Sequence, residues 1–237
     1  MSKHPAGTRG PHVFVPSLES PQVDEDDLGH LSRSLRLRDG DPLTISDGAG
    51  SWRRAEFVAD GRLDVVGDVF FIPERPRPLT VAFSLVKGSK PELVIQKLTE
   101  LGLDRIVVLA AHRSVVRWDN AKVDKAMARW QRIVREAAMQ SHRVRLPELE
   151  AVVSSTEWLA APENAISHFD GEPITNSVTS LAIGPEGGWD DVELDIVPAE
   201  SGRRFLLGHT VLRAETAAIT AGALLTASAR SPESDVR

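Results

Sequence analysis

The chain of 237 residues has no cysteine and no tyrosine, and aromatic residues make up only 5% of it. Without cysteine, disulfides, thiolate metal sites and a cysteine nucleophile are excluded. The scarcity of aromatic side chains argues against a platform on which single-stranded bases stack. No apolar run approaches the roughly 20 residues of a membrane-spanning helix, and residues 1–10 lack the apolar core of a signal peptide. We therefore expect a cytoplasmic protein with no membrane-bound segment.

Positive charge is not in excess either, since the formal net charge at pH 7 is −6. The overall charge therefore gives no indication of nucleic-acid binding, although a basic phosphate-binding face can lie on an acidic protein. Hydrophobic residues make up 41% of the chain and charged residues 26%. This composition is ordinary for a folded soluble protein and fits one large or two modest domains.

Residues 1–75 are predicted to form a small, mostly β domain. Apolar residues at helical spacing favour one helix over Asp24–Leu37, and Asp39-Gly40 and Asp47-Gly48 are turn signals of the hairpin type. Short apolar runs predict strands over His12–Val15, Leu63–Val66 and Val69–Ile72. The residues alone leave open whether this domain is structural and supports a dimer or docks RNA.

The segment Pro73–Pro78 is predicted to be a linker, because its three prolines remove backbone donors and favour an extended chain. From residue 79 to about 231, apolar strands alternate with helical patterns, as in an α/β domain with a parallel sheet. The expected strands are Leu79–Val86, Arg105–Ala110, Ala165–His168, Leu181–Ile183 and Phe205–Leu207. Helices are expected from Pro91 to about Leu101 and from about Asn120 to Gln140, and two more follow the crossings described below. Most of Ala151–Ser177 carries little signal, and Asp170–Ser177 is expected to be a loop.

Basic residues gather on and around the expected helix Asn120–Gln140. One stripe of the helix carries Lys122, Lys125, Arg129 and Arg132, and Arg113, Arg117, Arg143 and Arg145 flank the helix. A basic stripe alone is more often a solvated helix face. The four flanking arginines favour a phosphate-binding surface instead.

Two strand-to-helix crossings dominate the stretch Ser180–Ala229. The apolar runs before them each stop at a glycine, Gly184 and Gly208. Ligands of open α/β sheets bind where strands end and helices begin, so the two crossings predict one shared pocket. Gly184–Gly188 holds three glycines around Glu186, more than a plain turn needs, which favours ligand binding. Asp190 and Glu193 have the spacing of a capping box at the next helix.

Other glycine-rich and catalytic motifs do not fit this stretch or the rest of the chain. The segment Lys87–Lys90 lacks the spacing of a phosphate-binding Walker loop, and Gly184–Gly188 is not the dinucleotide-binding fingerprint. No serine lies in a nucleophile elbow, and the seven histidines do not pair at zinc-ligand spacing. At the second crossing, Arg213 and Glu215 precede a helix of small residues, which suits close packing against other backbone.

The motifs together resemble the ribosomal RNA small-subunit methyltransferase E family, whose members are uridine N3-methyltransferases of the SPOUT, or trefoil-knot, superfamily. The matching segments follow one another in order and span nearly the whole chain. They are His30…Leu35-Arg36…Asp39-Gly40-Asp41, Leu85-Val86-Lys87-Gly88…Lys90, Gln96-Lys97…Thr99-Glu100-Leu101-Gly102, Arg113-Ser114-Val115-Val116, Arg129-Trp130…Ile133…Glu136-Ala137-Ala138…Gln140-Ser141…Arg143, Pro147, Ile183–Gly188 and Leu207-Gly208…Val211-Leu212-Arg213…Glu215-Thr216-Ala217. The last two are the most specific. Three histidines, His12, His112 and His142, depart from the family pattern at positions that concern RNA contact.

The resemblance implies an N-terminal PUA-like β-barrel in residues 1–75 and a knotted SPOUT α/β domain in residues 79–231, with the alanine-rich helix threaded through the knot. It implies a homodimer that methylates uridine N3 in small-subunit (16S) ribosomal RNA, in an assembled particle, with S-adenosyl-L-methionine as cofactor. The implied RNA contacts are His12, Arg36, Arg113, Arg129 and Arg143. The implied cofactor-binding residues are Leu181, Ile183, Gly184, Pro185, Glu186, Gly187, Gly188, Leu207, Gly208, Val211, Leu212 and Thr216.

Methylation at uracil N3 needs loss of a proton, so the site needs a base or a cation that stabilises the anion. We hypothesise that Arg213 stabilises charge on a uracil carbonyl and that Glu215 is either the base or the group that orients Arg213. Glu186 is a rival for either acidic role. Two other functions stay open: a related knotted methyltransferase with another base target, and a non-catalytic RNA-binding or ribosome-assembly factor.

Overall fold

The computed structural model describes residues 4–58, 60–86, 88, 90–116 and 118–229. The chain folds into two compact units. The first unit consists of Met1–Arg75 with Arg135–Leu146, and the second of Pro76–Val134 with Pro147–Arg237. Lys87, Ser89 and Arg117, which belong to the loop and basic cluster predicted above, lie outside the described residues.

The first unit is built on a four-stranded sheet of order β1-β2-β3-β4. Its strands are β1 (His12–Phe14), β2 (Pro42–Ser46), β3 (Ser51–Phe57) and β4 (Leu63–Phe71). The pair β1–β2 is parallel and the other two pairs are antiparallel. Buried apolar residues of the sheet, with Leu31 and Leu18 beside them, form the core of this unit. The remaining elements are a 3₁₀ turn at Pro5–Gly7, helix α1 (Glu25–Gly29) and a π-helical turn at His30–Ser34.

Two predictions in the first unit are wrong in their boundaries. Leu63–Val66 and Val69–Ile72 are one strand, because Gly67 takes a φ of 71° and a register shift lets the pairing continue past it. The expected helix Asp24–Leu37 ends at Ser34, and Arg36 has a φ of 57°. His142, one of the three histidines that depart from the family pattern, also has a positive φ, 55°, a conformation that favours glycine.

The second unit holds a six-stranded parallel sheet of order β10-β8-β9-β5-β6-β7. Its strands are β5 (Thr80–Ser84), β6 (Arg105–Ala110), β7 (Glu148–Ser154), β8 (Ala165–Pro173), β9 (Ser180–Ile183) and β10 (Arg204–Leu206). Its helices are α2 (Lys90–Leu101), α3 (Asn120–Gln140, whose last residues belong to the first unit), α4 (Ser155–Leu159), α5 (Asp191–Ile196) and α6 (Ala214–Ser228), with a 3₁₀ turn at Ala199–Ser201. The predicted α/β class with a parallel sheet is thereby confirmed.

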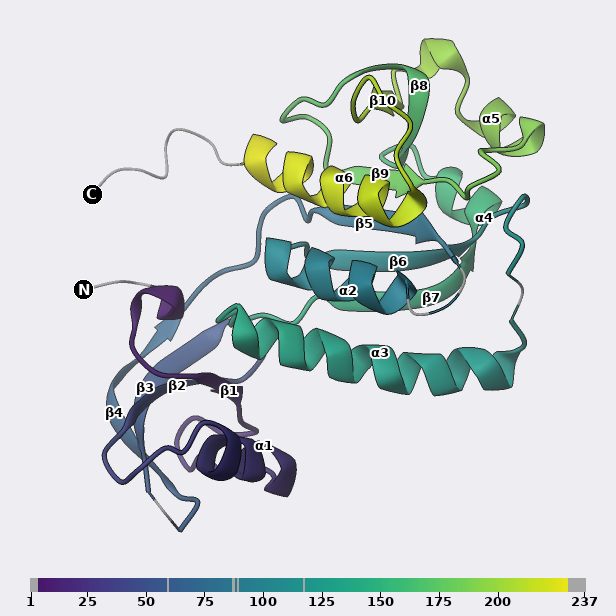
Figure 1. The fold of residues 1–237 in the computed structure, drawn as a ribbon. Helices are drawn as coiled ribbons and strands as arrows, with labels where there is room; N and C mark the ends of the chain where they lie inside the picture. Colours follow the sequence, from purple (N-terminus) through teal and green to yellow (C-terminus); the bar gives the residue numbers. More distant parts are fainter. Residues whose placement is uncertain (1–3, 59, 87, 89, 117, 230–237) are drawn as a thin grey trace. The chain divides into compact units, whose positions relative to one another are not determined.

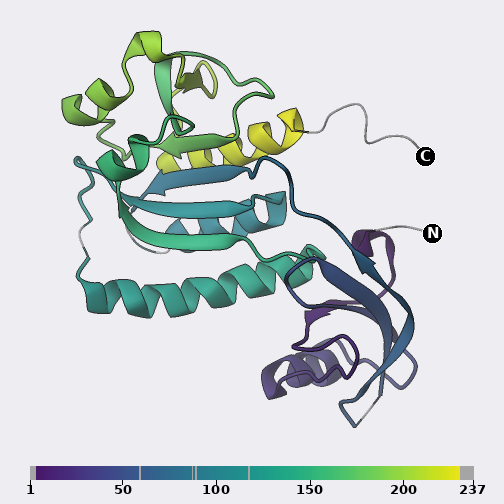
Figure 2. The same ribbon diagram turned by 180° about the vertical axis from the view of Figure 1, so that it is seen from behind.

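Each face of this sheet is covered by its own hydrophobic cluster. Helices α2 and α6 lie on one face in both views (Figures 1 and 2), where Leu98, Leu103 and Leu225 pack against Phe83 and Ile183. On the other face, Trp158 of α4 and Trp189 pack against alternate residues of the same strands. Successive side chains of a buried parallel strand point to opposite faces of the sheet, so each strand contributes residues to both clusters.

The small residues of α6 allow the close packing that the sequence predicted. A Cβ on Gly222 would lie 2.6 Å from Leu98 Cδ2 of α2, so only glycine fits this contact without a shift of the leucine. Ala218 and Ala221 are fully buried beside it. Within the described residues, no helix combines the length and the apolar character that a membrane span requires.

The segment between α3 and β9 is more regular than predicted. β7, α4 and the long strand β8 occupy it, and β8 continues through Asp170–Pro173, where a loop was expected. The reason is tertiary: β10 pairs with β8 as far as Pro173. Gly171 allows this approach, since a Cβ there would lie 2.5 Å from the backbone of Arg204 and Phe205.

Candidate functional site

The ends of β9 and β10 open into one cavity of about 640 Å³. The loops after the two strands both line it, together with Ser167, His168 and Phe169 of β8 and Lys90 at the start of α2. The prediction that the two glycine-marked crossings share one pocket is confirmed. A cavity of this size is in the range of small-molecule and cofactor sites.

The first loop, Gly184–Asp190, turns tightly at the cavity wall. Gly188 takes a φ of 72°, and its N–H donates to the carbonyl of Pro185 at 2.8 Å. Trp189 is buried behind the loop and donates from Nε1 to the carbonyl of Ser167 at 3.1 Å. A Cβ on Gly184 would lie 3.1 Å from the Trp189 ring, so this glycine lets the indole pack against the backbone.

The predicted capping box at α5 is present, and its acidic residue is fully buried. Asp190 caps the helix by accepting from the N–H groups of Val192 and Glu193, and the Glu193 carboxylate accepts from the N–H of Asp190 at 2.9 Å. The same carboxylate also accepts from the His112 N–H at 3.1 Å and from the Ser155 hydroxyl. Glu193 therefore joins the glycine loop to the segment after β6 and to α4.

The second loop, Leu207–Leu212, leads into α6, whose N-terminal flanking residue is Arg213. Leu207, Gly208, Val211, Leu212 and Arg213 all line the cavity. The side chain of Arg213 is exposed, and that of Val211 is 82% exposed although it is apolar. The loop thus presents a cation and apolar surface at the mouth of the cavity.

Lys90 links three segments at the cavity. Its Nζ lies 3.3 Å from Glu186 Oε1 of the glycine loop and 3.3 Å from Glu215 Oε2 of α6. Both contacts raise the pKa of Lys90, and the contact with Glu186 has the larger effect. The pKa of Glu215 is lowered, first by its own backbone N–H at the start of α6 and then by Lys90, against the opposing effect of burial. The Lys90 ammonium is therefore paired with the Glu215 carboxylate at neutral pH.

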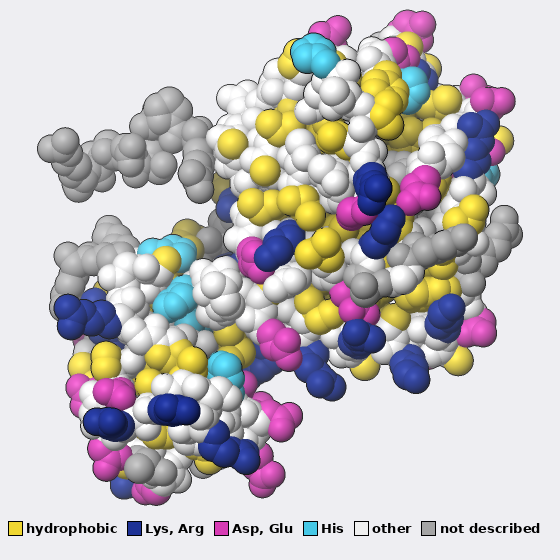
Figure 3. Space-filling model, viewed as in Figure 1, with side chains coloured by type: hydrophobic (Ala, Val, Ile, Leu, Met, Phe, Trp, Pro, Cys, Tyr) yellow, Lys and Arg dark blue, Asp and Glu magenta, His cyan; other side chains and the backbone are white. Residues whose placement is uncertain are grey.

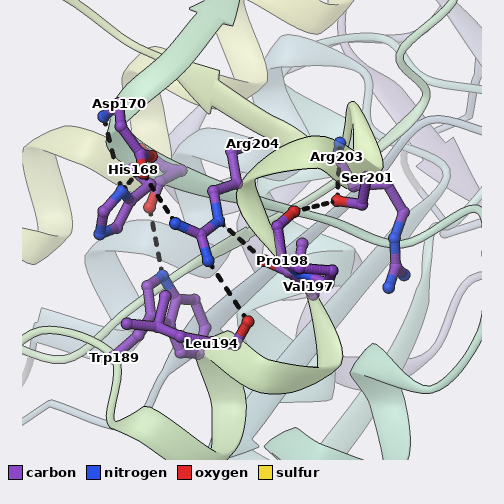
Figure 4. A network of polar contacts seen from close by, with 10 residues as sticks. His168, Asp170, Trp189, Leu194, Val197, Pro198, Ser201, Arg203 and Arg204 are labelled. Carbon is purple, nitrogen blue, oxygen red and sulfur yellow. Dashed lines mark hydrogen bonds and ion pairs between the residues drawn. The ribbon is translucent and has the colours of Figure 1, made fainter.

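A second polar network fixes the β8 side of the cavity (Figure 4). His168, which lines the cavity, contacts Asp170 through Nδ1, and Asp170 accepts from Arg204 of β10 at 2.7 Å. Arg204 also donates to the carbonyls of Leu194 and Val197 at the end of α5. Burial raises the pKa of Asp170, but His168 and Arg204 outweigh it and the net pKa is lowered. Strand β10 is thereby tied to both β8 and α5.

Nine of the twelve predicted cofactor-binding residues line the cavity: Ile183, Gly184, Pro185, Glu186, Gly188, Leu207, Gly208, Val211 and Leu212. Three are not among the lining residues. Leu181 is fully buried in the core, Gly187 is exposed beside Arg113, and Thr216 is exposed on α6. Of the predicted catalytic pair, Arg213 lines the cavity, while Glu215 reaches it through Lys90.

Sequence reasoning missed several lining residues: Lys90, Ser167, His168, Phe169, Trp189, Leu206, Thr210, Ala214 and Ala217. Trp189, Leu206, Thr210 and Ala214 adjoin predicted residues in the sequence, so the two loops themselves were the signal for them. Lys90 belongs to a segment that matches the family, but nothing in that segment indicated that it lines this cavity. No local signal marks the β8 residues, which come to the cavity only through the order of the strands.

The predicted RNA contacts lie in different surroundings. Arg36, Arg113 and Arg129 are exposed, and Arg129 donates to Glu92 at 2.7 Å. Lys and Arg side chains show over α3 in Figure 3, with carboxylates among them. Arg143 is half-buried.

His12 needs a correction as an RNA contact. Its side chain is 2% exposed, and its Nδ1 lies 2.8 Å from Thr44 Oγ1. Burial, with a smaller effect of His142, lowers the pKa of His12 to about 3. A neutral, enclosed imidazole offers no charge to a phosphate.

Comparison with known proteins agrees with an enzyme of the RNA methyltransferase class, because residues 73–226 match the family model described as RNA methyltransferase domain. The chain is 34% identical to ribosomal RNA small subunit methyltransferase E of Mycobacterium bovis, over 84% of this chain and 83% of the relative. It is 36% identical to the protein of the same name from Synechocystis, over 84% and 70%. The chain belongs to the ribosomal RNA small subunit methyltransferase E family.

Two similar solved structures carry a bound cofactor. One is a methyltransferase of Legionella pneumophila in complex with SAM, with a TM-score of 0.77 and 30% identity over 93% of this chain and 98% of that one. The other is ribosomal RNA small subunit methyltransferase E of Neisseria gonorrhoeae bound to S-adenosyl methionine, with a TM-score of 0.75 and 26% identity over 92% and 98%.

Proposed function

We propose that this protein methylates small-subunit (16S) ribosomal RNA at N3 of a uridine, with S-adenosyl-L-methionine as the methyl donor. The observation that carries the proposal is the single cavity into which both glycine-marked loops open, with Arg213 and Lys90 at its wall. The family supports the methyltransferase reaction on ribosomal RNA. The choice of uridine N3 rests on the resemblance described above.

The residues of the cavity fit the chemistry of the donor. Ile183, Leu207, Leu212 and Ala217 supply apolar surface of the kind that an adenine ring needs. A Cβ on Gly208 would meet no atom within 4 Å, so this glycine leaves open space at the wall. The Oε2 atom of Glu215 is enclosed and has no hydrogen-bond donor among the described residues, although Lys90 lies near it. Apolar walls and open backbone together suit a nucleoside.

S-adenosylmethionine supplies an electrophilic methyl group on a sulfonium. The chain's own residues must position the uracil and stabilise its anion after N3 loses its proton. Arg213, exposed at the wall, can face a uracil carbonyl on which that negative charge collects. Glu215 has a lowered pKa and is therefore a weak base. Its contact with Lys90 favours a role in holding that lysine over a role as the base.

The RNA would be bound through its phosphates by exposed arginines of both units, Arg36, Arg113 and Arg129, with Arg143. The proposal includes the architecture that the resemblance implies: a PUA-like β-barrel in residues 1–75, a trefoil knot in residues 79–231, and a cytoplasmic homodimer acting on an assembled particle. Cation-rich surfaces bind RNA in proportion to the phosphates they neutralise.

The decisive experiment is nucleoside mass spectrometry of 16S ribosomal RNA from a strain that lacks the gene. We expect 3-methyluridine to be lost, and to return with the wild-type gene but not with Arg213→Ala. Calorimetry with S-adenosylmethionine should show that Arg213→Ala still binds the donor. Loss of a different methylated base would point to another target atom. An unchanged RNA, with no donor binding, would leave a non-catalytic RNA-binding factor.

A further inference from the structure

Opposite charges meet at the cavity wall where Lys90 lies. Lys90, in the first turn of α2, and Glu186, in the glycine loop, both line the cavity and form an ion pair at 3.3 Å. Glu215, in the first turn of α6, holds the same ammonium from the other side at 3.3 Å. Figure 3 shows basic and acidic side chains next to one another over the N-terminal end of α6.

The two carboxylates differ in their surroundings. The Glu215 side chain is 14% exposed, whereas that of Glu186 is 66% exposed. An exposed ion pair is weak and exchanges readily with water or with a ligand. The Lys90–Glu215 contact is therefore the fixed half of the cluster, and the Lys90–Glu186 contact is the half that a ligand can open.

We propose that Lys90 and Glu186 form a subsite for the amino-acid end of the methyl donor. Lys90 pairs with the α-carboxylate, Glu186 pairs with the α-ammonium, and Glu215 positions Lys90. This inference rests on the proposed function, since it presupposes that the donor binds in this cavity.

The two charges of the ligand's amino-acid end are complementary to those of Lys90 and Glu186. The carboxylate and ammonium of an α-amino acid sit on one carbon, so their partners must be a cation and an anion side by side. Among the described residues that line the cavity, Lys90 and Glu186 make such a pair. Asp170, the partner of the cavity residue His168, is already bound by Arg204 and His168. Exchange of the Lys90–Glu186 contact for two contacts with the ligand keeps every charge paired.

The test uses three ligands that share the methylthioadenosine part and lose the charges of the amino-acid end in steps. Methylthioadenosine also lacks the sulfonium charge, so each ligand is compared with itself across the variants. S-adenosylmethionine has both charges, decarboxylated S-adenosylmethionine keeps the ammonium alone, and methylthioadenosine has neither. Calorimetry would measure the Kd of each for wild type, Lys90→Gln and Glu186→Gln. Lys97→Gln is the matched control, because Lys97 lies on the same helix and pairs with Glu100 instead.

We expect Lys90→Gln to weaken S-adenosylmethionine about tenfold, as loss of one charge-assisted contact does, and to change the other two ligands less than twofold. Glu186→Gln should weaken both ligands that carry the ammonium and leave methylthioadenosine unchanged. Lys97→Gln should change none. Equal weakening of all three ligands by Lys90→Gln would mean that the lysine only supports the fold, and unchanged binding of S-adenosylmethionine would also overturn the proposal. If wild type binds none of the three, the proposed function itself fails.

Discussion

Replacing Glu193 by glutamine should destabilise the second unit far more than the loss of one surface charge would. The carboxylate has no exposed surface and accepts three hydrogen bonds, from the N–H groups of His112 and Asp190 and from the Ser155 hydroxyl. Glutamine has nearly the same shape but only one acceptor oxygen. With that oxygen at the Oε1 position, the amide nitrogen would face the N–H of Asp190, donor against donor.

The cost follows from these bonds. The partly buried N–H of Asp190 loses its acceptor, which costs about 1–3 kcal/mol, and the two remaining bonds lose the contribution of a charged acceptor. We therefore expect Glu193→Gln to lower the free energy of unfolding by about 2–4 kcal/mol. Asp195→Asn, an exposed carboxylate on the same helix, should change it by less than about 0.5 kcal/mol.

Urea unfolding at pH 7 followed by tryptophan fluorescence would measure the change, because Trp158 and Trp189 pack in the cluster beside Glu193. Amide hydrogen exchange gives a local readout, in which the N–H of Asp190 should lose protection before that of His112. A Glu193→Gln protein within 0.5 kcal/mol of wild type, with Asp190 still protected, would refute the account of this residue.

Three further predictions concern other parts of the chain. Gly171→Ala should destabilise the second unit by about 3 kcal/mol or more in thermal unfolding, because its Cβ would meet backbone of β10 that cannot move aside. Gly208→Ala, whose Cβ would lie in open space, should leave the thermal unfolding unchanged. Burial lowers the pKa of His12 from 6.5 to about 3. Between these two pH values the unfolded state therefore binds one proton that the folded state does not bind. The free energy of unfolding of the first unit should then fall by about 1.4 kcal/mol per pH unit as the pH decreases from about 6 towards 3, and His12→Gln should flatten this slope in acid titrations. Arg129→Gln should reduce by about 1 the slope of log affinity for ribosomal RNA against log salt, with donor binding unchanged; equal slopes would remove Arg129 from the RNA surface.

The sequence was sufficient for elements whose pattern is local. β6 and α3 have the predicted bounds, because an unbroken apolar run and a 21-residue amphipathic stripe leave little ambiguity. The capping box of Asp190 and Glu193 was equally local. β8 was underestimated because its second half, with Asp170 and Gly171, has strand character only through β10.

Some parts of the candidate site could also be predicted from local sequence, and others could not. Its two loops were predictable because a glycine directly after a strand indicates a backbone turn that favours glycine. The position of Lys90 was not predictable, because it depends on how α2 packs against α6. The burial of His12 likewise depends on Thr44 and the His142 ring, which are distant from it in the sequence. Contacts between residues that are distant in the sequence produce no pattern in residue spacing or composition.

The ion pair between Lys90 and Glu215 has an electrostatic consequence beyond the two side chains. It joins the first turns of α2 and α6, so two helices of 12 and 15 residues begin side by side at the cavity. Each helix start carries a partial positive charge of about half a unit from its unpaired N–H groups. Together they give the cavity a positive potential made of backbone, which no change of pH and no side-chain substitution removes. A negatively charged ligand group would meet this field before any side chain moves.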